Sequence, residues 1–219
     1  MKPLISAKEA VSKIKDGDSI LVAGFMCCGQ AFDLVDALLE QGTKDLTIIC
    51  NDAGYPEKGI GKLIVAGRVK NLIATHIGLN PVAGQKMNSG ELEVELVPQG
   101  TFAERVRAGG AGLGGILTPT GVGTKVEEGK QIIDIDGRAY ILEKAIKADH
   151  AFIKANITDE NGNAFVAKSA KNFNYVMASA AENTIVETEK FVKAGELWDE
   201  QVTVPCVFVK NIVEASYGR

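Results

Sequence analysis

Short apolar runs alternate with helical spacing in the first third of the chain. Residues 20–23 (ILVA) and 46–50 (LTIIC) are apolar runs of the kind found in strands buried on both faces of a parallel sheet. Between them, residues 32–41 place apolar side chains at helical spacing. A short helix over residues 61–66 and a strand over residues 70–76 follow. This alternation predicts the βαβαβ arrangement of an open, doubly wound α/β sheet.

The rest of the chain is predicted to mix both kinds of element. Ser6 and Glu9 have the spacing of a capping box and predict a helix over residues 7–15. The alternating run at residues 91–97 (ELEVELV) predicts a half-exposed strand at a sheet edge or in a subdomain. The later predicted elements are a helix at 101–108, a hairpin turning at Asp136-Gly137, a strand at 150–157, a turn at 159–163 into a strand at 164–167, a helix at 175–182, and strands at 184–188 and 206–215. We predict one domain over residues 1–219.

Composition places the chain among ordinary globular proteins. It has 219 residues, of which 46% are hydrophobic and 24% charged. The formal charge of -4 gives no electrostatic reason to expect nucleic acid or an anionic membrane as a partner. No apolar run approaches the roughly 20 residues of a membrane span, and the first residues lack the apolar region of a secretory signal. We therefore expect a cytoplasmic protein.

Cysteine and histidine are few and scattered, at Cys27, Cys28, Cys50, Cys206, His76 and His150. No Cys-x-x-Cys pair is present, so we expect neither a metal site nor a disulfide framework. The cysteines are interpreted as small buried hydrophobes or free thiols. The other possibility is a reactive thiolate at Cys27 or Cys28, close to a helix start.

The connection between the first strand and its helix is bracketed by Gly24 and Gly29. Such a loop brings backbone N–H groups to the positive end of a helix, where an anion is held favourably. The spacing matches the first half of a P-loop, but Gln30 and Ala31 occupy the positions of its Lys and Ser or Thr. We therefore predict anion binding without nucleotide hydrolysis, the alternative being an ordinary strand-to-helix connection.

A second glycine-rich segment spans residues 109–124. Gly110, Gly112 and Gly115 satisfy the letters of the dinucleotide fingerprint. A predicted helix precedes them and Pro119 follows, whereas the fingerprint needs a strand before it and a helix after it. The segment is interpreted as a place where the backbone approaches a ligand or another chain closely.

Several motifs in order resemble the A (alpha) subunit of the two-subunit 3-oxoacid CoA-transferases, which include the acetate/acetoacetate and butyrate/acetoacetate enzymes. The N-terminal signature corresponds here to Asp16-Gly17, two residues, three apolar residues, Ala23-Gly24-Phe25 and Gly29. Ala23 stands at a family glycine and Ala31 at a family proline. Further matching stretches are CNDAG (50–54), GIGKLI (59–64), HIGLNP (76–81), VPQGTFAERVRAGGAGLGG (97–115), LTPTGVGT (117–124) and KNFN (171–174).

The resemblance implies an open, mostly parallel α/β sheet flanked by helices, the CoA-transferase (NagB/RpiA-like) fold. It also implies a heteromer with a B (beta) subunit, usually two copies of each. Family members move CoA between an acyl-CoA and a free short-chain acid by a ping-pong mechanism. The nucleophile is a glutamate of the beta subunit in a Ser-Glu-Asn-Gly motif. CoA is then a substrate, and no permanently bound cofactor is expected.

The resemblance also implies roles for residues of this chain. Gln99 of VPQGT matches the glutamine that supports the oxyanion hole. CoA or substrate-carboxylate binding is implied for Ala23, Gly24, Phe25, Met26, Cys27, Cys28 and Gly29. Asn51 and Asn172 are weaker candidates. Glu160-Asn161-Gly162 imitates the nucleophile motif, but Asp159 replaces its serine and turn chemistry explains the residues. We therefore expect the nucleophile to lie outside this chain.

Two other functions fit a glycine-loop α/β chain. A sugar-phosphate isomerase-like enzyme would need its own acid and base, for which Asp52 or Glu57 would have to serve. A non-catalytic module could instead sense an acyl-CoA or a sugar phosphate. Such sensors usually carry a basic helix-turn-helix, for which this sequence shows neither room nor charge at its ends.

Overall fold

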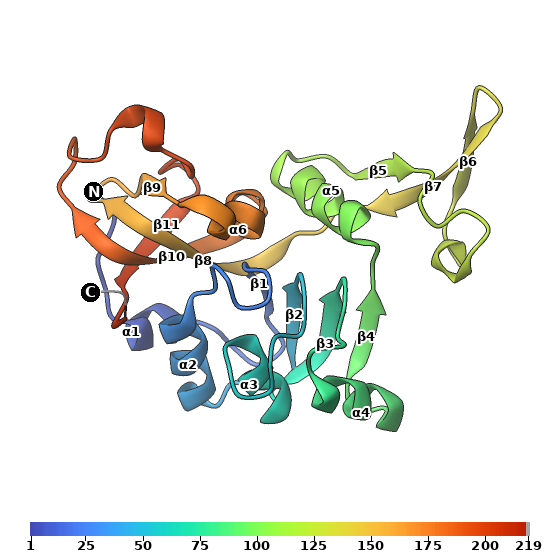
Figure 1. The fold of residues 1–219 in the computed structure, drawn as a ribbon, viewed down its shortest axis with the longest axis horizontal. Helices are drawn as coiled ribbons and strands as arrows, with labels where there is room; N and C mark the ends of the chain where they lie inside the picture. Colours follow the sequence, from blue (N-terminus) through green and yellow to red (C-terminus); the bar gives the residue numbers. More distant parts are fainter. Residues whose placement is uncertain (218–219) are drawn as a thin grey trace.

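The centre of the molecule is a mostly parallel sheet, seen in the computed structural model, which describes residues 1–217 (Figure 1). Its strand order is β11-β10-β8-β1-β2-β3-β4, and the short β9 pairs with β8 as the antiparallel member. The strands are β1 (Ser19–Val22), β2 (Leu46–Cys50), β3 (Val69–Ala74), β4 (Glu93–Leu96), β8 (Ala148–Asp159), β9 (Ala164–Phe165), β10 (Ala181–Val192) and β11 (Val209–Glu214). This arrangement confirms the predicted open α/β sheet.

The position of β1 decides where a site can form. The chain winds outward from β1 to β4 and then returns to β8 on the other side of β1. Ile20 and His150 are opposite each other in that β1–β8 pair. Ligands of open parallel sheets bind at such a reversal of strand order, outside the carboxyl ends of the strands. The glycine loop that follows β1 lies at this place.

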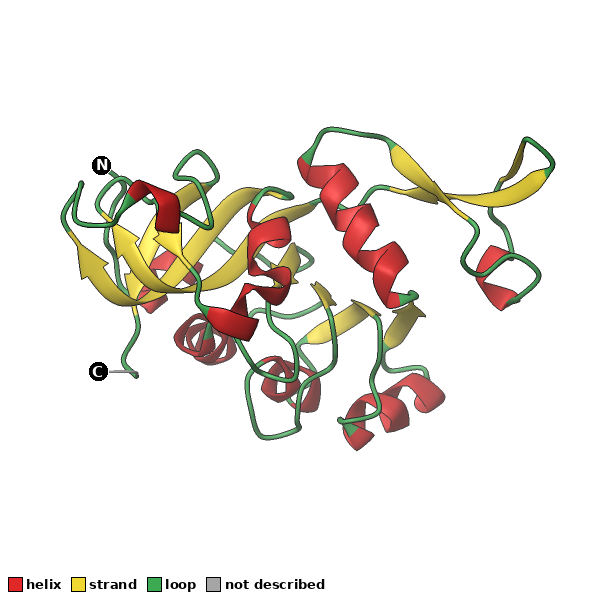
Figure 2. Cartoon of the chain, turned by 45° about the horizontal axis from the view of Figure 1, so that its top comes forward, coloured by secondary structure: helices red, strands yellow, loops and turns green. Residues whose placement is uncertain are grey.

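Helices cover both faces of the sheet (Figure 2). The helices are α1 (Ala7–Val11), α2 (Phe32–Gln41), α3 (Ile60–Val65), α4 (Pro81–Ser89), α5 (Gln99–Gly110) and α6 (Lys171–Ala178), with short 3-10 turns at Lys125–Glu127, Lys168–Ala170 and Asp199–Gln201. Ile20 and Val22 of β1 belong to the core beneath α1 to α4. Leu21 and Ala23 belong to the core beneath α5 and α6. All four side chains are fully buried, as the apolar run predicted.

A three-stranded antiparallel sheet projects from the body, at the right of Figure 1. It consists of β5 (Gly115–Thr118), β6 (Ile132–Ile135) and β7 (Arg138–Lys144), and we call it the arm. Asp136 and Gly137 connect β6 to β7 with φ values of 53° and 77°. Both residues are in the left-handed region that a two-residue hairpin turn requires, so the predicted hairpin is confirmed.

Two predicted helices differ from the structure by more than two residues at an end. The first helix ends at Val11 instead of residue 15, because Ser12 directs both its backbone N–H and its hydroxyl to the Glu9 carbonyl and terminates the helix. Helix α6 begins at Lys171 and ends at Ala178, earlier than the predicted 175–182. The small apolar residues after Ala178 looked helical in sequence, but they lead into β10 and its long pairing with β8.

Helix α4 was not predicted, although its sequence carries end signals. The Asn80 side chain accepts a hydrogen bond from the Ala83 N–H, and Pro81 occupies the first turn. Gly90 closes the helix with φ of 80°. The apolar stripe of this helix is weak, with Ala83 as its buried residue, so periodicity alone did not reveal it.

Candidate active site

The loop after β1 is a tight turn that uses its own backbone donors. The N–H of Phe25 bonds the Cys28 carbonyl at 3.0 Å, and the Cys28 N–H bonds the Phe25 carbonyl at 2.8 Å. Met26 and Cys27 between them have φ of 47° and 67°, a conformation that costs about 1 kcal/mol or more per non-glycine residue. The Met26 N–H donates to Asp52 at 2.8 Å, which holds the turn in place. These three N–H groups therefore do not form the open anion cradle that the sequence predicted.

The two bracketing glycines are required by close packing. A Cβ on Gly24 would lie 2.5 Å from Cγ of Gln30, and one on Gly29 would lie 2.8 Å from the side-chain nitrogen of Asn174. That nitrogen donates to the Gly29 carbonyl at 2.9 Å. Gln30 is buried, and its side-chain oxygen accepts from the N–H of Ile60, at the start of α3. Gln30, which stands at the position of the P-loop lysine, therefore has a structural role here.

The two departures from the family signature are accommodated by ordinary backbone. Ala23 is fully buried in the core beneath α5 and α6, and its N–H donates to the Phe152 carbonyl at 3.0 Å. Its φ is not positive, so glycine is not needed there. Ala31 precedes α2 with φ of -84°, close to the angle that proline imposes.

The positive end of α2 is occupied by an internal carboxylate. Glu187 of β10 accepts the Leu34 N–H at 2.8 Å and a hydrogen bond from the Tyr217 hydroxyl. That hydroxyl also lies 3.3 Å from the Phe32 N–H. Burial raises the pKa of Glu187 to about 7, although the Tyr217 and Leu34 hydrogen bonds oppose the shift. Burial, followed by the Glu187 charge, raises the pKa of Tyr217. The anion expected at this helix is therefore the protein's own.

Gln99 is the first residue of α5 and is exposed at the carboxyl edge of the sheet. Its side-chain N–H₂ donates one hydrogen bond to the side-chain oxygen of Asn51 at 2.7 Å. The Thr75 hydroxyl donates to the same oxygen at 3.2 Å and to the Asn51 carbonyl at 2.8 Å. An amide N–H₂ has two hydrogens. Asn51 therefore orients Gln99 and leaves its second hydrogen for a ligand.

Asp52 joins the Gln99 network to the glycine loop. It is 1% exposed, and one carboxylate oxygen accepts both the Asn51 side chain at 2.7 Å and the Met26 N–H at 2.8 Å. The other oxygen accepts the Gly54 N–H at 3.0 Å. Both carboxylate oxygens of Asp52 thus accept hydrogen bonds within the site, which argues against its use as the general base of an isomerase.

A cavity of about 300 Å³ opens beside Gln99. We call it the α5–α6 cavity; its lining residues are Phe25, Gln99, Gly100, Ala103, Arg107, Asn172, Phe173, Tyr175 and Val176. It brings together Gln99, Phe25 from the predicted loop and the weaker candidate Asn172. The Asn172 side chain also donates to the Cys28 carbonyl at 3.0 Å, which links α6 to the loop. Of the α6 wall, the sequence singled out Asn172 but not Tyr175 or Val176.

The two loop cysteines have different environments. Cys27 is 7% exposed, and burial raises the pKa of its thiol. This shift disfavours the thiolate that the sequence left open at Cys27. Cys28 is exposed, and its sulfur lies 3.5 Å from the Ser169 hydroxyl.

Several other polar residues have structural partners within the chain. Arg105 is largely buried and reaches the Lys144 carbonyl at 2.8 Å and Glu95 at 2.6 Å. Glu160 lies in a turn that is closed by the carboxylate of Asp159. The ring of His150 lies between polar side chains, 3.2 Å from Asp18 and 3.1 Å from Asn183.

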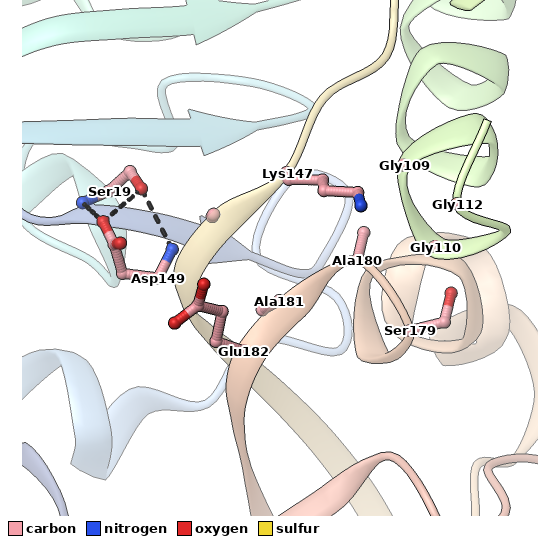
Figure 3. Close-up of a pocket in the computed structure, with 11 residues that line it drawn as sticks. Ser19, Gly109, Gly110, Gly112, Lys147, Asp149, Ser179, Ala180, Ala181 and Glu182 are labelled. Atoms are coloured by element: carbon pink, nitrogen blue, oxygen red, sulfur yellow. Dashed lines mark hydrogen bonds between the residues drawn. The ribbon is translucent and has the colours of Figure 1, made fainter. Parts of the chain in front are cut away.

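A second cavity, of about 370 Å³, lies at the amino ends of β1, β8 and β10 (Figure 3). Lys147, Asp149 and Glu182 line it, and none of the predicted site residues does. Gly109, Gly110 and Gly112 of the glycine-rich segment also line it. A Cβ on Gly109 would lie 1.9 Å from the Ile146 carbonyl, and one on Gly110 would lie 2.1 Å from the Ser179 hydroxyl. The close approach predicted for this segment is therefore made within the chain itself.

Within residues 1–217 no cluster of three or more metal-ligating side chains occurs. None of the helices described there is long and apolar enough to cross a membrane.

The comparison with known families decides which chemistry this geometry serves. The family model described as Coenzyme A transferase matches residues 4–215. The chain belongs to the coenzyme A transferase family. Its sequence is 49% identical, over 99% of this chain and 98% of the relative, to acetate CoA-transferase subunit alpha of Escherichia coli K12. It is 51% identical, over 93% of each chain, to the acetoacetyl-CoA:acetate/butyrate CoA transferase alpha subunit of Clostridium acetobutylicum.

A solved coenzyme A transferase shares the fold over the whole chain. The acyl-CoA transferase of Escherichia coli O157:H7, in a thioester complex with CoA, superposes with a TM-score of 0.90 at 25% identity. This chain is covered completely but spans only about half (48%) of that protein. The names of the relatives, which call them alpha subunits, imply that a coenzyme A transferase chain of this length works with a partner.

Proposed function

We propose that this chain is the alpha subunit of a two-subunit CoA-transferase that exchanges CoA between a short-chain acyl-CoA and a free short-chain acid. One observation carries the proposal: the α5–α6 cavity presents the oriented amide of Gln99, while none of its lining residues carries a carboxylate. A site with an oxyanion donor and no carboxylate nucleophile needs a second chain to supply one.

The proposed reaction begins at the thioester carbonyl. A glutamate carboxylate of the partner attacks the carbonyl carbon, the C–S bond breaks, and CoA leaves as a thiolate with the bonding electron pair. The thiolate then attacks the glutamyl carbonyl of the resulting anhydride, which releases the first acid and leaves CoA on the partner's glutamate. The acceptor acid reverses these steps. The acyl group stays activated throughout, so no nucleotide is consumed.

Gln99 acts when negative charge develops on the carbonyl oxygen. Its second amide hydrogen donates to that oxygen, while the first remains on Asn51. The network through Asn51 to Asp52 is formed within the chain before any ligand binds, so little reorganisation is needed in the transition state. Phe25 lines the same cavity, so the signature loop contributes a wall of the pocket.

The relatives support a choice of substrates and assembly. Acetate, butyrate and acetoacetyl-CoA appear in the names of relatives about half identical to this chain. We therefore propose acetyl-, butyryl- or acetoacetyl-CoA as donors and the corresponding acids as acceptors. We propose two copies of each of the two chains in the assembled enzyme.

The test is reconstitution with the partner chain. The purified chain alone should show no CoA transfer, and mixing it with a beta subunit that carries Ser-Glu-Asn-Gly should produce activity. Borohydride added with an acyl-CoA reduces the glutamyl-CoA thioester and should mark a glutamate of the beta chain. Reduction at a residue of this chain, or full activity of the chain by itself, would contradict the proposal.

A further inference from the structure

Helices α5 and α6 run side by side and form the two long walls of the α5–α6 cavity. Phe102 of α5 and Phe173 of α6 meet edge to face, with ring centroids 5.5 Å apart. Gly110 at the end of α5 packs against Ser179 at the end of α6. The carboxyl ends of the two helices therefore lie together. At their amino ends, Gln99 of α5 and Asn172 of α6 line the same cavity, and Asn172 also bonds the Cys28 carbonyl of the loop after β1.

The polar and apolar groups of the cavity are separated along α5. Gln99, Ala103 and Arg107 are spaced by four residues and so lie in one row along the helix. Arg107, which pairs with Glu104 at 3.1 Å, is about 12 Å along the helix axis from Gln99. Between these two polar positions the walls are Ala103 on one helix and Phe173 and Val176 on the other. A substrate group that extends from Gln99 along this row therefore contacts apolar side chains before it reaches Arg107.

We propose that the α5–α6 cavity is the acyl subsite and that Val176 limits the length of the acyl chain. This inference rests on the proposed function, because Gln99 fixes the position of the thioester carbonyl. From that carbonyl the acyl chain and the CoA arm leave in different directions. A volume of about 300 Å³ is at the low end for ligand pockets, so it has room for a short acyl chain but not for the pantetheine arm and nucleotide of CoA as well.

The side chains between Gln99 and Arg107 also set the chemical class of the acyl group. Val176 lines the cavity from the α6 side and is 7% exposed, since most of its side chain packs into the core beneath α5 and α6. A saturated or 3-oxo chain of up to four carbons would extend from Gln99 along Ala103 and Val176. Arg107 lies at the other end of this row, about two turns of α5 from Gln99, and its guanidinium pairs with Glu104.

A second hollow on the other side of α5 offers a matched control. This cavity of about 470 Å³ is lined by Gly100, Thr101, Ala103, Glu104, Ile116, Leu117, Thr118 and Thr120. Gly100 and Ala103 line both cavities, so both begin at the same turn of α5. Its lining includes the carboxylate of Glu104 and the hydroxyls of Thr118 and Thr120, whereas no carboxylate lines the α5–α6 cavity.

The experiment measures kcat/KM of the reconstituted enzyme for acetyl-, butyryl- and hexanoyl-CoA. Val176→Phe fills the α5–α6 cavity and should lower the butyryl-to-acetyl ratio about tenfold or more. Val176→Ala enlarges it and should raise the hexanoyl-to-butyryl ratio about tenfold. Thr118→Leu adds similar bulk to the other cavity and should leave both ratios within about twofold.

The outcomes separate this inference from the function on which it rests. If the wild-type complex transfers CoA and the Val176 variants keep its chain-length profile, the acyl subsite is elsewhere. If Thr118→Leu shifts the profile instead, the acyl chain lies in the second cavity and the inference is wrong. Absence of CoA transfer by the wild-type complex would overturn the proposed function itself. The opposite directions expected for the Phe and Ala variants keep the test decisive if one of them folds poorly.

Discussion

At the scale of single residues, the site is built from side chains that orient one another. Gln99 is exposed and would be free to rotate, but Asn51 accepts one of its amide hydrogens and Asp52 in turn fixes Asn51. Asp52 has no surface to offer a substrate, because it is buried and bonded at both oxygens. The proposed oxyanion donor is therefore supported by two residues that do not line the α5–α6 cavity.

This hierarchy predicts a non-additive double-mutant cycle between Gln99 and Asn51. Gln99→Ala should lower kcat of the assembled enzyme about a hundred- to a thousandfold, because one oxyanion donor is lost. Asn51→Ala should lower kcat at least about tenfold by releasing Gln99 from its productive orientation. The double variant should be no slower than Gln99→Ala, since Asn51 acts through Gln99.

The measurement is steady-state kcat together with gel filtration of the complex, in which both variants should assemble normally. Asn88→Ala, an exposed asparagine of α4, is the control and should keep wild-type kcat. Losses that add in the double variant would show that Asn51 acts independently of Gln99.

Glu187 predicts how stability depends on pH. Its pKa rises from 4.5 to about 7 on folding, chiefly through burial. The folded state therefore binds the proton more tightly, and this contribution to stability is complete below about pH 4.5 and lost as the pH rises through 7. Urea denaturation at pH 5.5, 7.0 and 8.5 should show Glu187→Gln gaining stability relative to the wild type as the pH rises.

The exposed Glu182 on the same strand provides the control, because Glu182→Gln should follow the wild-type pH profile. A wild-type protein and a Glu187→Gln variant that change in parallel over this range would disprove the assignment.

At the scale of elements, the arm is attached to the body by a buried ionic cluster. Glu143 of β7 is 1% exposed and lies 2.6 Å from Lys130 and 3.8 Å from Arg105 of α5. Arg105 also bonds Glu95 of β4 and the Lys144 carbonyl. These contacts fix α5, and with it Gln99, between the edge of the main sheet and the arm.

Removing the buried carboxylate of this cluster should destabilise the protein. Glu143→Ala takes away the acceptor of Lys130, while Arg105 keeps Glu95 and the Lys144 carbonyl, so we expect a loss of about 1–3 kcal/mol in the free energy of unfolding. Glu104→Ala removes an exposed partner of Arg107 from the same helix and should cost about 1 kcal/mol or less. Urea unfolding of the three proteins at one pH measures both values, and equal losses would contradict the buried role of Glu143.

Sequence patterns predicted the elements where local chemistry determines them. The run at residues 46–50 and the Asp136-Gly137 turn have the predicted bounds, because burial and turn geometry depend on adjacent residues. The same reasoning missed α4, whose apolar stripe is weak. The family resemblance singled out Gln99, but only the structure reveals the hydrogen bond from Gln99 to Asn51, 48 residues away.

At the scale of the whole molecule, residues far apart in sequence complete the centre of the fold. Helix α2 receives its N-terminal carboxylate from Glu187, 153 residues after Leu34. Tyr217 then packs its ring at 5.6 Å from Phe32 and donates to Glu187. No local pattern links these positions, which explains why the sequence predicted an external anion at this helix.

The Tyr217 contact should matter to the whole fold. Tyr217→Ala removes both the ring packing and the hydroxyl, and should lower the free energy of unfolding by about 1–3 kcal/mol. Tyr217→Phe keeps the ring against Phe32 and should lose less. Amide hydrogen exchange at residues 32–35 should accelerate more in the Ala variant than in the Phe variant. Unchanged exchange in both would mean that α2 does not depend on this contact.

The order of synthesis gives the Glu187 contact a further consequence. A ribosome that has made β1 to β4 has not yet made Glu187, so α2 of the nascent polypeptide begins with its first amides unpaired. The edge of β1 that pairs with β8 in the folded protein has no partner strand at the same stage. A half-sheet formed at that stage would expose an unpaired strand edge, and we expect molecular chaperones to bind it until the later strands emerge.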